Sequence, residues 1–409
     1  MIDYYETKQH PITKKMVLEA YRKVKSNKGS AGIDEQSLTD FDQNAPSHLY
    51  RIWNRMSSGS YHPPVVKQVE IPKKSGGVRN LGIPTVSDRI AQQVVKSYLE
   101  PKVDSSFHSD SYGYRSGKSA HQALAKAVTN CGYYSWVVDL DIKGFFDNLD
   151  HDLLMLAVKR YTKEKWILMY IDRWLKAGVS KGGVVVNRER GTPQGGVISP
   201  LLSNIFLHFA FDKWMENNHP NMPFERYCDD AIIHCTTEKQ ALFIRDVVAK
   251  RMKERRLELN QEKTHVVYCK NMTHTESHTS VSFDFLSYTF RPLRRPTKNG
   301  WLLTYFPCMS KTSKNDVRQK LRKVVGRSYK GTIQDLAKVL NPKIRGWYRY
   351  YCHYSHWTTR DVWYWLNTKM VRWIMNTRRM GKGRAHRWLV NVYKTNPRLF
   401  EHWPYVRPY

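Results

Sequence analysis

The chain has 409 residues and carries 67 lysines and arginines against 36 aspartates and glutamates, a formal net charge of +31 at pH 7. A charge of this size predicts a polyanionic partner, because each phosphate that a basic side chain neutralises releases counterions. A membrane surface is the competing partner. We discount it because no long apolar segment is present and residues 1–10 lack the apolar core of a signal peptide.

The six cysteines are scattered along the chain without CxxC spacing. This pattern supports neither a zinc site nor a disulfide framework, and it predicts a reducing, cytoplasmic location. With 41% hydrophobic residues, a chain of this length can bury more than one core, so two or three lobes are expected.

Residues 1 to about 65 have the pattern of helices. The segments 16–24 and 49–56 carry apolar residues at helical spacing, and we expect an N-terminal helical extension from them. A further helix is expected over 88–99.

A basic hairpin is predicted next, over residues 71–84 (IPKKSGGVRNLGIP). Two strands joined by a glycine turn would carry Lys73 and Arg79 on one hairpin. These side chains suit a triphosphate, which lysine meets as a point charge and arginine through two parallel hydrogen bonds. An ordinary basic hairpin on a basic protein is the alternative.

The segment 136–147 (WVVDLDIKGFFD) is an apolar run interrupted by alternating acids. It predicts a strand whose end carries Asp141 into a cleft, with Asp139 offset by the two-residue period of a strand.

Residues 191–204 (GTPQGGVISPLLSN) combine a glycine-rich turn with a helix that begins near Pro200. Such a turn lets the backbone approach a ligand closely. An ordinary glycine turn before a core helix is the alternative.

Tyr227-Cys228-Asp229-Asp230, followed by Ile232 and Ile233, predicts a β-hairpin whose tight turn carries two acids to a sheet edge. An Asp-Asp pair in a turn is more often a solvated loop. Together with a strand-end aspartate, however, the pair can hold two Mg²⁺ ions roughly 3.5–4 Å apart, which bind an attacking 3′-hydroxyl and a leaving pyrophosphate.

Aromatic and basic residues interleave from about residue 304 onward, and a polar stretch at 271–280 is expected to be a loop. At helical spacing, many of the tryptophans are expected to pack in a small core while lysines and arginines face a groove. Stacking of these aromatics on exposed bases is the alternative.

In their order and spacing, these segments resemble the reverse transcriptases of bacterial group II introns over nearly the whole chain. Further matching strings are KGSAGID (28–34), TVSDRIAQQ (85–93), SYGYR (111–115), LELNQEKT (257–264), FDFLSYTF (283–290) and NPKIRGWYRYY (341–351). The resemblance implies an α+β right-hand polymerase: an N-terminal helical extension (1–65), fingers and palm with an antiparallel sheet (66–292), and a helical thumb or maturase domain (293–409).

The resemblance also implies a set of metal ligands. Asp141 and Asp229 would bind two Mg²⁺ ions directly, the backbone carbonyl of Ile142 would assist, and Asp230 would complete the acidic cluster. Lys263 would be the general acid for the leaving pyrophosphate, although a surface lysine beside Glu262 is an equally ordinary interpretation.

Nucleotide and nucleic-acid contacts follow from the same resemblance. Phe146 would exclude a 2′-hydroxyl, so the enzyme should prefer deoxynucleotides, while Phe145 is the alternative candidate and either ring can be a core aromatic. Gln194 would lie along the incoming nucleotide and the template pair. The residues expected to contact nucleotide or nucleic acid are Lys73, Arg79, Ile142, Phe146, Gln194, Tyr227, Arg345 and Arg349.

Two departures from the family pattern bear on function. The hairpin carries Cys228 where these enzymes usually have alanine; cysteine is nearly as small, so the turn should survive. The chain also shows no ligands for the zinc-stabilised endonuclease found at the end of many relatives, so self-sufficient second-strand cleavage is not expected.

The predicted function is an RNA-directed DNA polymerase that extends a DNA or RNA primer on an RNA template and binds a cognate structured RNA. A domesticated enzyme in antiviral defence that copies its own noncoding RNA is one alternative. A splicing maturase with a silent polymerase is another, and the intact acids argue against it. An RNA polymerase or primase is disfavoured by the bulk of Phe146.

Overall fold

The computed structural model describes residues 3–72, 77–297, 300–326 and 329–408. The chain divides into two compact units, each of which we describe by itself. Unit 1 contains residues 1–130 and 136–266, and unit 2 contains residues 131–135 and 267–409.

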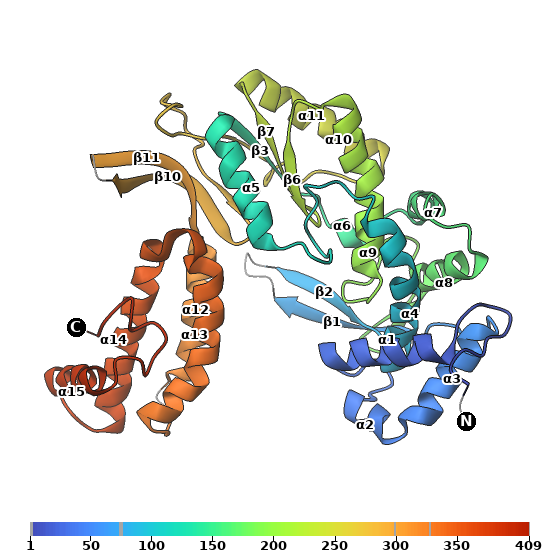
Figure 1. The fold of residues 1–409 in the computed structure, drawn as a ribbon, viewed down its shortest axis with the longest axis horizontal. Coiled ribbons are helices and arrows are strands. Elements are labelled where there is room, and N and C mark those ends of the chain that lie inside the picture. The colour runs from blue at the N-terminus through green and yellow to red at the C-terminus, as the bar shows by residue number, and fades with distance from the viewer. Residues whose placement is uncertain (1–2, 73–76, 298–299, 327–328, 409) are drawn as a thin grey trace. The chain divides into compact units, whose positions relative to one another are not determined.

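Unit 1 begins with helices and continues with two sheets and their surrounding helices (Figure 1). Its helical elements are α1 (Lys14–Asn27), α2 (Leu38–Gln43), α3 (Ala45–Ser57), α4 (Val86–Asp104), α5 (Ala120–Tyr133), α6 (Phe145–Asn148), α7 (His151–Lys159), α8 (Lys165–Lys176), α9 (Ser199–Leu207), the π-helical turn η1 (His208–Asp212), α10 (Lys213–Asn218) and α11 (Glu238–Glu254). Its strands are β1 (Val66–Pro72), β2 (Val78–Ile83), β3 (Trp136–Leu140), β4 (Val179–Lys181), β5 (Val184–Val186), β6 (Phe224–Tyr227), β7 (Asp230–Cys235) and β8 (His265–Tyr268). The last residues of α5 and β8 belong to unit 2.

The predicted N-terminal helices are confirmed. Helix α1 begins where the Thr13 hydroxyl accepts a hydrogen bond from the Met16 amide at 3.2 Å, which satisfies a backbone donor that has no partner inside the helix. Its buried face, which includes Val17 and Ala20, packs on α4, a helix whose first half is almost entirely buried. The other two predicted segments lie within α3 and α4.

The two sheets of unit 1 hold the segments that the sequence singled out. One has the strand order β2-β1-β4-β5, and its antiparallel β1–β2 pair is the predicted basic hairpin. The other has the order β6-β7-β3-β8, in which β7 is antiparallel to both β6 and β3. Helix α11 packs on β3 and β7 (Figure 1). The antiparallel palm sheet is therefore confirmed.

Unit 2 contains a three-stranded antiparallel sheet and a group of helices (Figure 1). Its elements are β9 (Phe283–Phe285), β10 (Tyr288–Thr297), β11 (Gly300–Met309), α12 (Lys311–Val324), α13 (Ile333–Ser355), the 3₁₀ turn η2 (His356–Thr359), α14 (Arg360–Thr377) and α15 (Lys382–Thr395). Trp363 and Trp373 are buried, as the core-packing prediction requires, whereas Trp357 is exposed. The 271–280 stretch is a loop, as predicted, and it belongs to unit 2.

The predicted boundary between residues 292 and 293 is not a structural boundary, because it falls inside strand β10, where Pro292 pairs in register with Tyr305. The division between compact units lies upstream, at residue 267. The segment after 292 therefore begins as a long hairpin, and its helices start at Lys311. The assignment of residues 1–65, 66–292 and 293–409 to an N-terminal extension, fingers and palm, and thumb remains a prediction.

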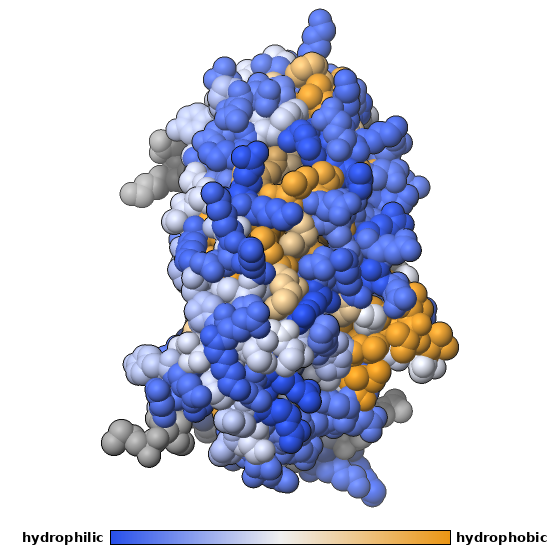
Figure 2. Space-filling view, turned by 90° about the vertical axis from the view of Figure 1, so that its right-hand side faces the viewer, coloured by the Kyte–Doolittle hydropathy of each residue, from blue (hydrophilic) through white to orange (hydrophobic). Residues whose placement is uncertain are grey.

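The surface agrees with the composition of the chain. Hydrophilic side chains cover most of the face turned to the viewer in Figure 2, and apolar side chains appear in smaller patches. None of the helices in the described part of the chain combines the length and apolar character that a membrane span requires.

Candidate active site

The two acids of the Tyr227–Asp230 hairpin lie at a two-residue turn, as predicted. Tyr227 ends β6 and pairs with Asp230, the first residue of β7, so Cys228 and Asp229 form the turn. Cys228 has a φ of +62°, a left-handed conformation that is uncommon outside glycine and concentrates at functional sites. The turn thus presents Asp229 and Asp230 side by side at one end of the sheet.

Asp141 reaches the same end of the sheet from β3. The antiparallel register pairs Leu140 with Ala231. Asp141 follows Leu140 and Asp230 precedes Ala231, so the two acids lie opposite each other at the same end of the sheet. Its backbone continues this pairing on the other side, where the Asn260 amide donates to the Asp141 carbonyl at 2.8 Å and Ile142 forms a bridge with Leu259. The structure therefore brings the three predicted acids together.

The acids influence one another electrostatically. Removal from water, together with the negative charges of Asp229 and Asp141, raises the pKa of Asp230 to about 7, while Arg79 and Lys263 oppose the shift. The Asp230 residue as a whole is exposed. Its pKa is nevertheless raised, because the neighbouring carboxylates repel one another and favour the neutral form. Lys263 Nζ lies 3.9 Å from Asp141 Oδ2, which places the predicted general acid beside the acids.

The donor set fits Mg²⁺, although the side chains do not enclose an ion as they stand. Within the described ranges, no three His, Cys, Asp or Glu side chains lie close enough to form a metal site. A few carboxylates with room for water and phosphate oxygens are what Mg²⁺ prefers, and its charge would relieve the repulsion that raises the pKa of Asp230. Burial and the charge of Asp229 raise the pKa of the Cys228 thiol, which favours the protonated thiol over the thiolate that binds metals.

Sequence reasoning missed the residue that supports the turn, Arg226. Its buried guanidinium donates to both carboxylate oxygens of Asp212 at 2.6 Å and to Asn204 Oδ1 at 3.0 Å. It also donates to the Cys228 carbonyl at 2.9 Å and to Ser111 Oγ at 2.8 Å. A guanidinium with this many partners fixes the backbone of the acidic turn. The available signal was the adjacent charged pair Glu225 and Arg226 directly before the acidic hairpin turn.

The SYGYR string packs against the turn from another side. Tyr112 donates its amide to the Arg226 carbonyl at 2.8 Å, and Asn204 Nδ2 donates to the Gly113 carbonyl at 2.8 Å. A Cβ on Gly113 would lie 2.4 Å from the Cys228 amide nitrogen. Only glycine allows this approach of the two backbones.

The glycine-rich segment closes onto the short helix α6. The Thr192 amide donates to the Phe146 carbonyl at 2.7 Å, and Gly191, with a φ of +81°, lies against the backbone of Asp147. Phe146 and Phe145 are both buried and meet edge to face. The assignment of Phe146 as the gate stays a prediction, because burial suits a core aromatic equally well.

Gln194 connects the glycine-rich segment to the basic hairpin. Its Oε1 accepts from Arg79 Nε at 2.5 Å, and its backbone carbonyl accepts from the Gly82 amide at 2.7 Å. The structure thereby places two of the predicted nucleotide contacts against each other. Lys73, which is also a predicted nucleotide contact, lies outside the described residues.

The predicted nucleic-acid contacts lie in both units. Tyr227 is half-buried in unit 1. Arg345 and Arg349 are exposed on α13 of unit 2, and Arg345 Nε donates to Glu401 Oε1 at 3.0 Å. The charge of Arg345 is thus partly balanced within its own unit, a feature that the sequence did not indicate.

Residues 71–290 match the family Reverse transcriptase (RNA-dependent DNA polymerase), over more than half of the chain. The chain therefore belongs to this family. Residues 314–393 match the group II intron, maturase-specific domain. Together with the antiparallel palm sheet and the C-terminal helices, the two matches confirm the predicted fold class and the resemblance to group II intron enzymes.

Similar proteins come from bacteria and yeast. Protein YkfC of Escherichia coli (strain K12) is 36% identical over 208 residues, which cover 49% of this chain and 54% of YkfC. The group II intron-encoded protein LtrA of Lactococcus lactis subsp. cremoris is 36% identical over 199 residues, covering 48% of this chain and 33% of LtrA. The putative COX1/OXI3 intron 2 protein of Saccharomyces cerevisiae is 32% identical over 208 residues, 51% of this chain and 24% of that protein. The chain thus spans between about a quarter and about half of these relatives.

Among solved structures, telomerase from Candida albicans in complex with a fragment of telomeric RNA aligns with 90% of this chain and 68% of that chain. The TM-score is 0.49 at 11% identity. This likeness is too weak to support a functional conclusion.

Proposed function

We propose that this protein is an RNA-directed DNA polymerase of the group II intron type, which extends a DNA or RNA primer on an RNA template. The observation that carries the proposal is the register of β3 and β7, which brings Asp141 to the level of Asp230 beside the Asp229 turn. Three carboxylates at one sheet end suit a polymerase that holds two Mg²⁺ ions.

In this mechanism each side chain acts on one part of the reaction. When bound, two Mg²⁺ ions supply charge stabilisation to the attacking 3′-hydroxyl and the leaving pyrophosphate. Asp141 and Asp229 would hold them together with the Ile142 carbonyl, and Asp230 would complete the acidic cluster. Lys263 donates a proton to the pyrophosphate, and Arg79 and Lys73 bind the triphosphate of the deoxynucleotide.

A role as a maturase that binds a structured RNA is the second candidate function. The match of residues 314–393 to the maturase-specific domain favours it. The two functions are compatible, because the acids lie in unit 1 and the matched residues lie in unit 2. We propose that unit 2 supplies much of the affinity for a cognate RNA.

The test is the double substitution Asp229→Ala with Asp230→Ala. We expect primer extension to fall by about a thousandfold or more, since the acids act on transition-state charge. RNA affinity should stay nearly unchanged, because basic side chains supply most of the binding. Extension of a labelled primer and RNA binding at fixed salt measure the two effects.

The matched control is Asp172→Ala with Asp246→Ala, which removes the half-buried Asp172 and the exposed Asp246 of unit 1 from local ion pairs with Lys176 and Arg245. It changes the net charge equally and should leave extension intact. Mg²⁺-dependent synthesis by a folded Asp229→Ala, Asp230→Ala variant would refute the assigned site.

A further inference from the structure

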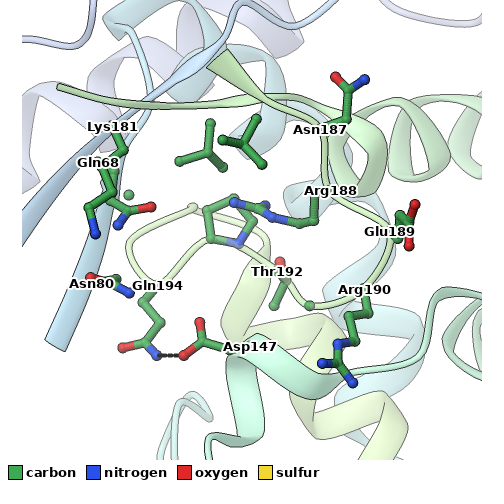
Figure 3. Close-up of a pocket in the computed structure, with 15 residues that line it drawn as sticks. Gln68, Asn80, Asp147, Lys181, Asn187, Arg188, Glu189, Arg190, Thr192 and Gln194 are labelled. Atoms are coloured by element: carbon green, nitrogen blue, oxygen red, sulfur yellow. Dashed lines mark hydrogen bonds between the residues drawn. The ribbon is translucent and has the colours of Figure 1, made fainter. Parts of the chain in front are cut away.

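Unit 1 contains a small cavity that lies apart from the candidate active site. The larger cavity beside Gln194 belongs to that site, because Gln194 and Asp147 both line it and are joined by a hydrogen bond of 3.5 Å (Figure 3). The small cavity, of about 310 Å³, lies between α7, α9, the π-helical turn η1 and the end of α11. Within the described part of the chain, none of the predicted site residues lines it. Its lining combines three arginines with leucine, phenylalanine and alanine side chains.

The arginines of this cavity carry more positive charge than nearby acids balance. Arg251 Nη1 pairs with Glu254 at 3.5 Å, and its other nitrogens donate to two carbonyls of η1. Among the described residues, Arg160 and Arg255 have no acidic partner within ion-pair distance, and the buried Nε of Arg255 has no hydrogen-bond partner. Burial lowers the pKa of Arg251, and the positive charge of Arg255 adds to this effect. A buried donor on a cation costs free energy until an acceptor reaches it, so the cavity favours an anionic partner.

The rest of the lining is apolar. Phe206 and Ala157 are buried, Phe209 is half-buried, and Leu156 on α7 is 60% exposed. A single exposed leucine is ordinary on a protein surface, but this one borders a cavity that arginines also line. An apolar side chain placed here would be removed from water, and an acid beside it would meet an arginine.

The composition of the lining favours a peptide over a nucleic acid. Arginine is the only polar type among the described residues that line the cavity, and arginine donates hydrogen bonds but cannot accept them. A nucleobase would find no side-chain acceptor for its own donors, whereas an aliphatic side chain needs none. A phosphate chain would pair with the arginines but leave the apolar lining uncovered. The volume is at the lower end of the range for ligand pockets, roughly 300–1,000 Å³, and suits one large side chain.

We propose that this cavity docks an acidic segment of a partner protein, with one apolar side chain in the cavity and carboxylates on Arg160 and Arg255. An amphipathic helix that lays an apolar anchor into a groove is a recurring mode of peptide recognition. Acids one helical turn from the anchor would lie on the same face of such a helix and reach the arginines. The proposal goes beyond the polymerase function and does not depend on it.

The experiment is a selection of short random peptides, displayed on phage, against the immobilised full-length protein. An excess of duplex RNA during the selection occupies basic grooves and removes peptides that bind by charge alone. We expect the enriched peptides to share an apolar residue with Asp or Glu one helical turn away. Fluorescence anisotropy of a labelled enriched peptide then gives its affinity for the parent and for variants.

Leu156→Asp and Arg160→Glu change exposed side chains of the cavity, so both variants should fold, which their melting temperatures check. Each should weaken binding of the peptide by about tenfold or more, the usual effect of losing an anchor or a charge contact at an interface. Lys253→Glu is the matched control, because Lys253 is exposed, lies between Arg251 and Arg255 in the chain and does not line the cavity. It should keep the affinity of the parent.

A second arm alters only the peptide and requires no variant to fold. Replacing its acids by amides, or its apolar anchor by alanine, should each weaken binding to the parent. The proposal is overturned if no peptide with the acidic and apolar pattern is enriched, or if such a peptide binds the parent, Leu156→Asp and Arg160→Glu equally. It is also overturned if Arg160→Glu loses affinity for duplex RNA as strongly as for the peptide, since the cavity would then be part of an RNA surface.

Discussion

At the scale of single residues, Phe145 and Phe146 are the two candidates for the side chain that excludes a 2′-hydroxyl. Both rings are buried and they touch each other. The backbone carbonyl of Phe146, however, accepts a hydrogen bond from the amide of Thr192. Thr192 lies two residues before Gln194 in the chain. Phe146 is therefore fixed to the segment that carries a predicted nucleotide contact, which favours it over Phe145 as the gate.

Phe146→Val should raise the use of ribonucleotides relative to deoxynucleotides by about tenfold or more, because a smaller side chain leaves space for a 2′-hydroxyl. Valine is preferable to alanine, since truncating a buried Phe to Ala costs about 3–5 kcal/mol. Single-nucleotide extension with matched deoxy and ribo substrates measures the ratio. Phe145→Val is the control, and a shift seen there but not in Phe146→Val would make Phe145 the gate.

At the scale of elements, the acidic hairpin depends on side chains from three other segments. The Arg226 guanidinium, next to the turn, donates hydrogen bonds to Ser111, Asn204 and Asp212. Asp212 ends the π-helical turn η1 between α9 and α10, a kind of irregularity found often at functional sites. Because Arg226 and Asp212 are both buried, loss of either partner leaves an uncompensated charge.

Arg226→Lys should therefore impair catalysis without abolishing RNA binding. Lysine keeps the charge, but its ammonium group cannot donate hydrogen bonds to Asp212, Asn204, Ser111 and the Cys228 carbonyl at the same time. We expect kcat to fall by about a hundredfold if the acids move by about 1 Å. Melting temperature and extension, assayed well below the melting transition, separate folding from positioning.

Arg251→Lys is the matched control for this variant. Arg251 donates to the Phe209 and Ala210 carbonyls of the same π-helical turn but does not touch the hairpin. It should keep kcat near the parent value. Gly113→Ala, which pushes on the Cys228 amide, should reproduce the defect. A folded Arg226→Lys protein with unchanged kcat would show that the turn needs no such support.

The sequence alone predicted those helices and strands whose pattern is local. The acidic hairpin, the strand before Asp141 and helices α1, α3 and α4 follow from alternation, helical spacing and turn residues within a few positions. The cluster around Arg226 could not be predicted, because its partners at 111, 204 and 212 meet only through tertiary packing. The long β10–β11 hairpin was also missed, since Pro292 and Pro296 favour a break inside a strand.

At the scale of the whole molecule, the net charge of +31 predicts nucleic-acid contacts, but local motifs do not specify where on the surface they lie. In unit 2, α13 exposes Arg345 and Arg349 one helical turn apart. Arg345 already pairs with Glu401, so Arg349 is the clearer test of a basic binding face. Exposed pairs of this kind contribute little to stability, so the variants should fold.

The thumb prediction is that Arg349→Glu, alone and with Arg345→Glu, weakens RNA or duplex binding and makes its dependence on salt shallower. Each lost phosphate contact should lower the logarithmic slope by about one unit.

Lys343→Glu is the matched control, since it changes the same charge on a different face of α13. Binding isotherms over a series of salt concentrations give the slopes, and extension at saturating template should persist in all variants. If the Arg349→Glu slope equals that of the parent, this face is not in contact with phosphate, and the N-terminal lysines around Lys23, Lys25 and Lys28 become the next surface to test.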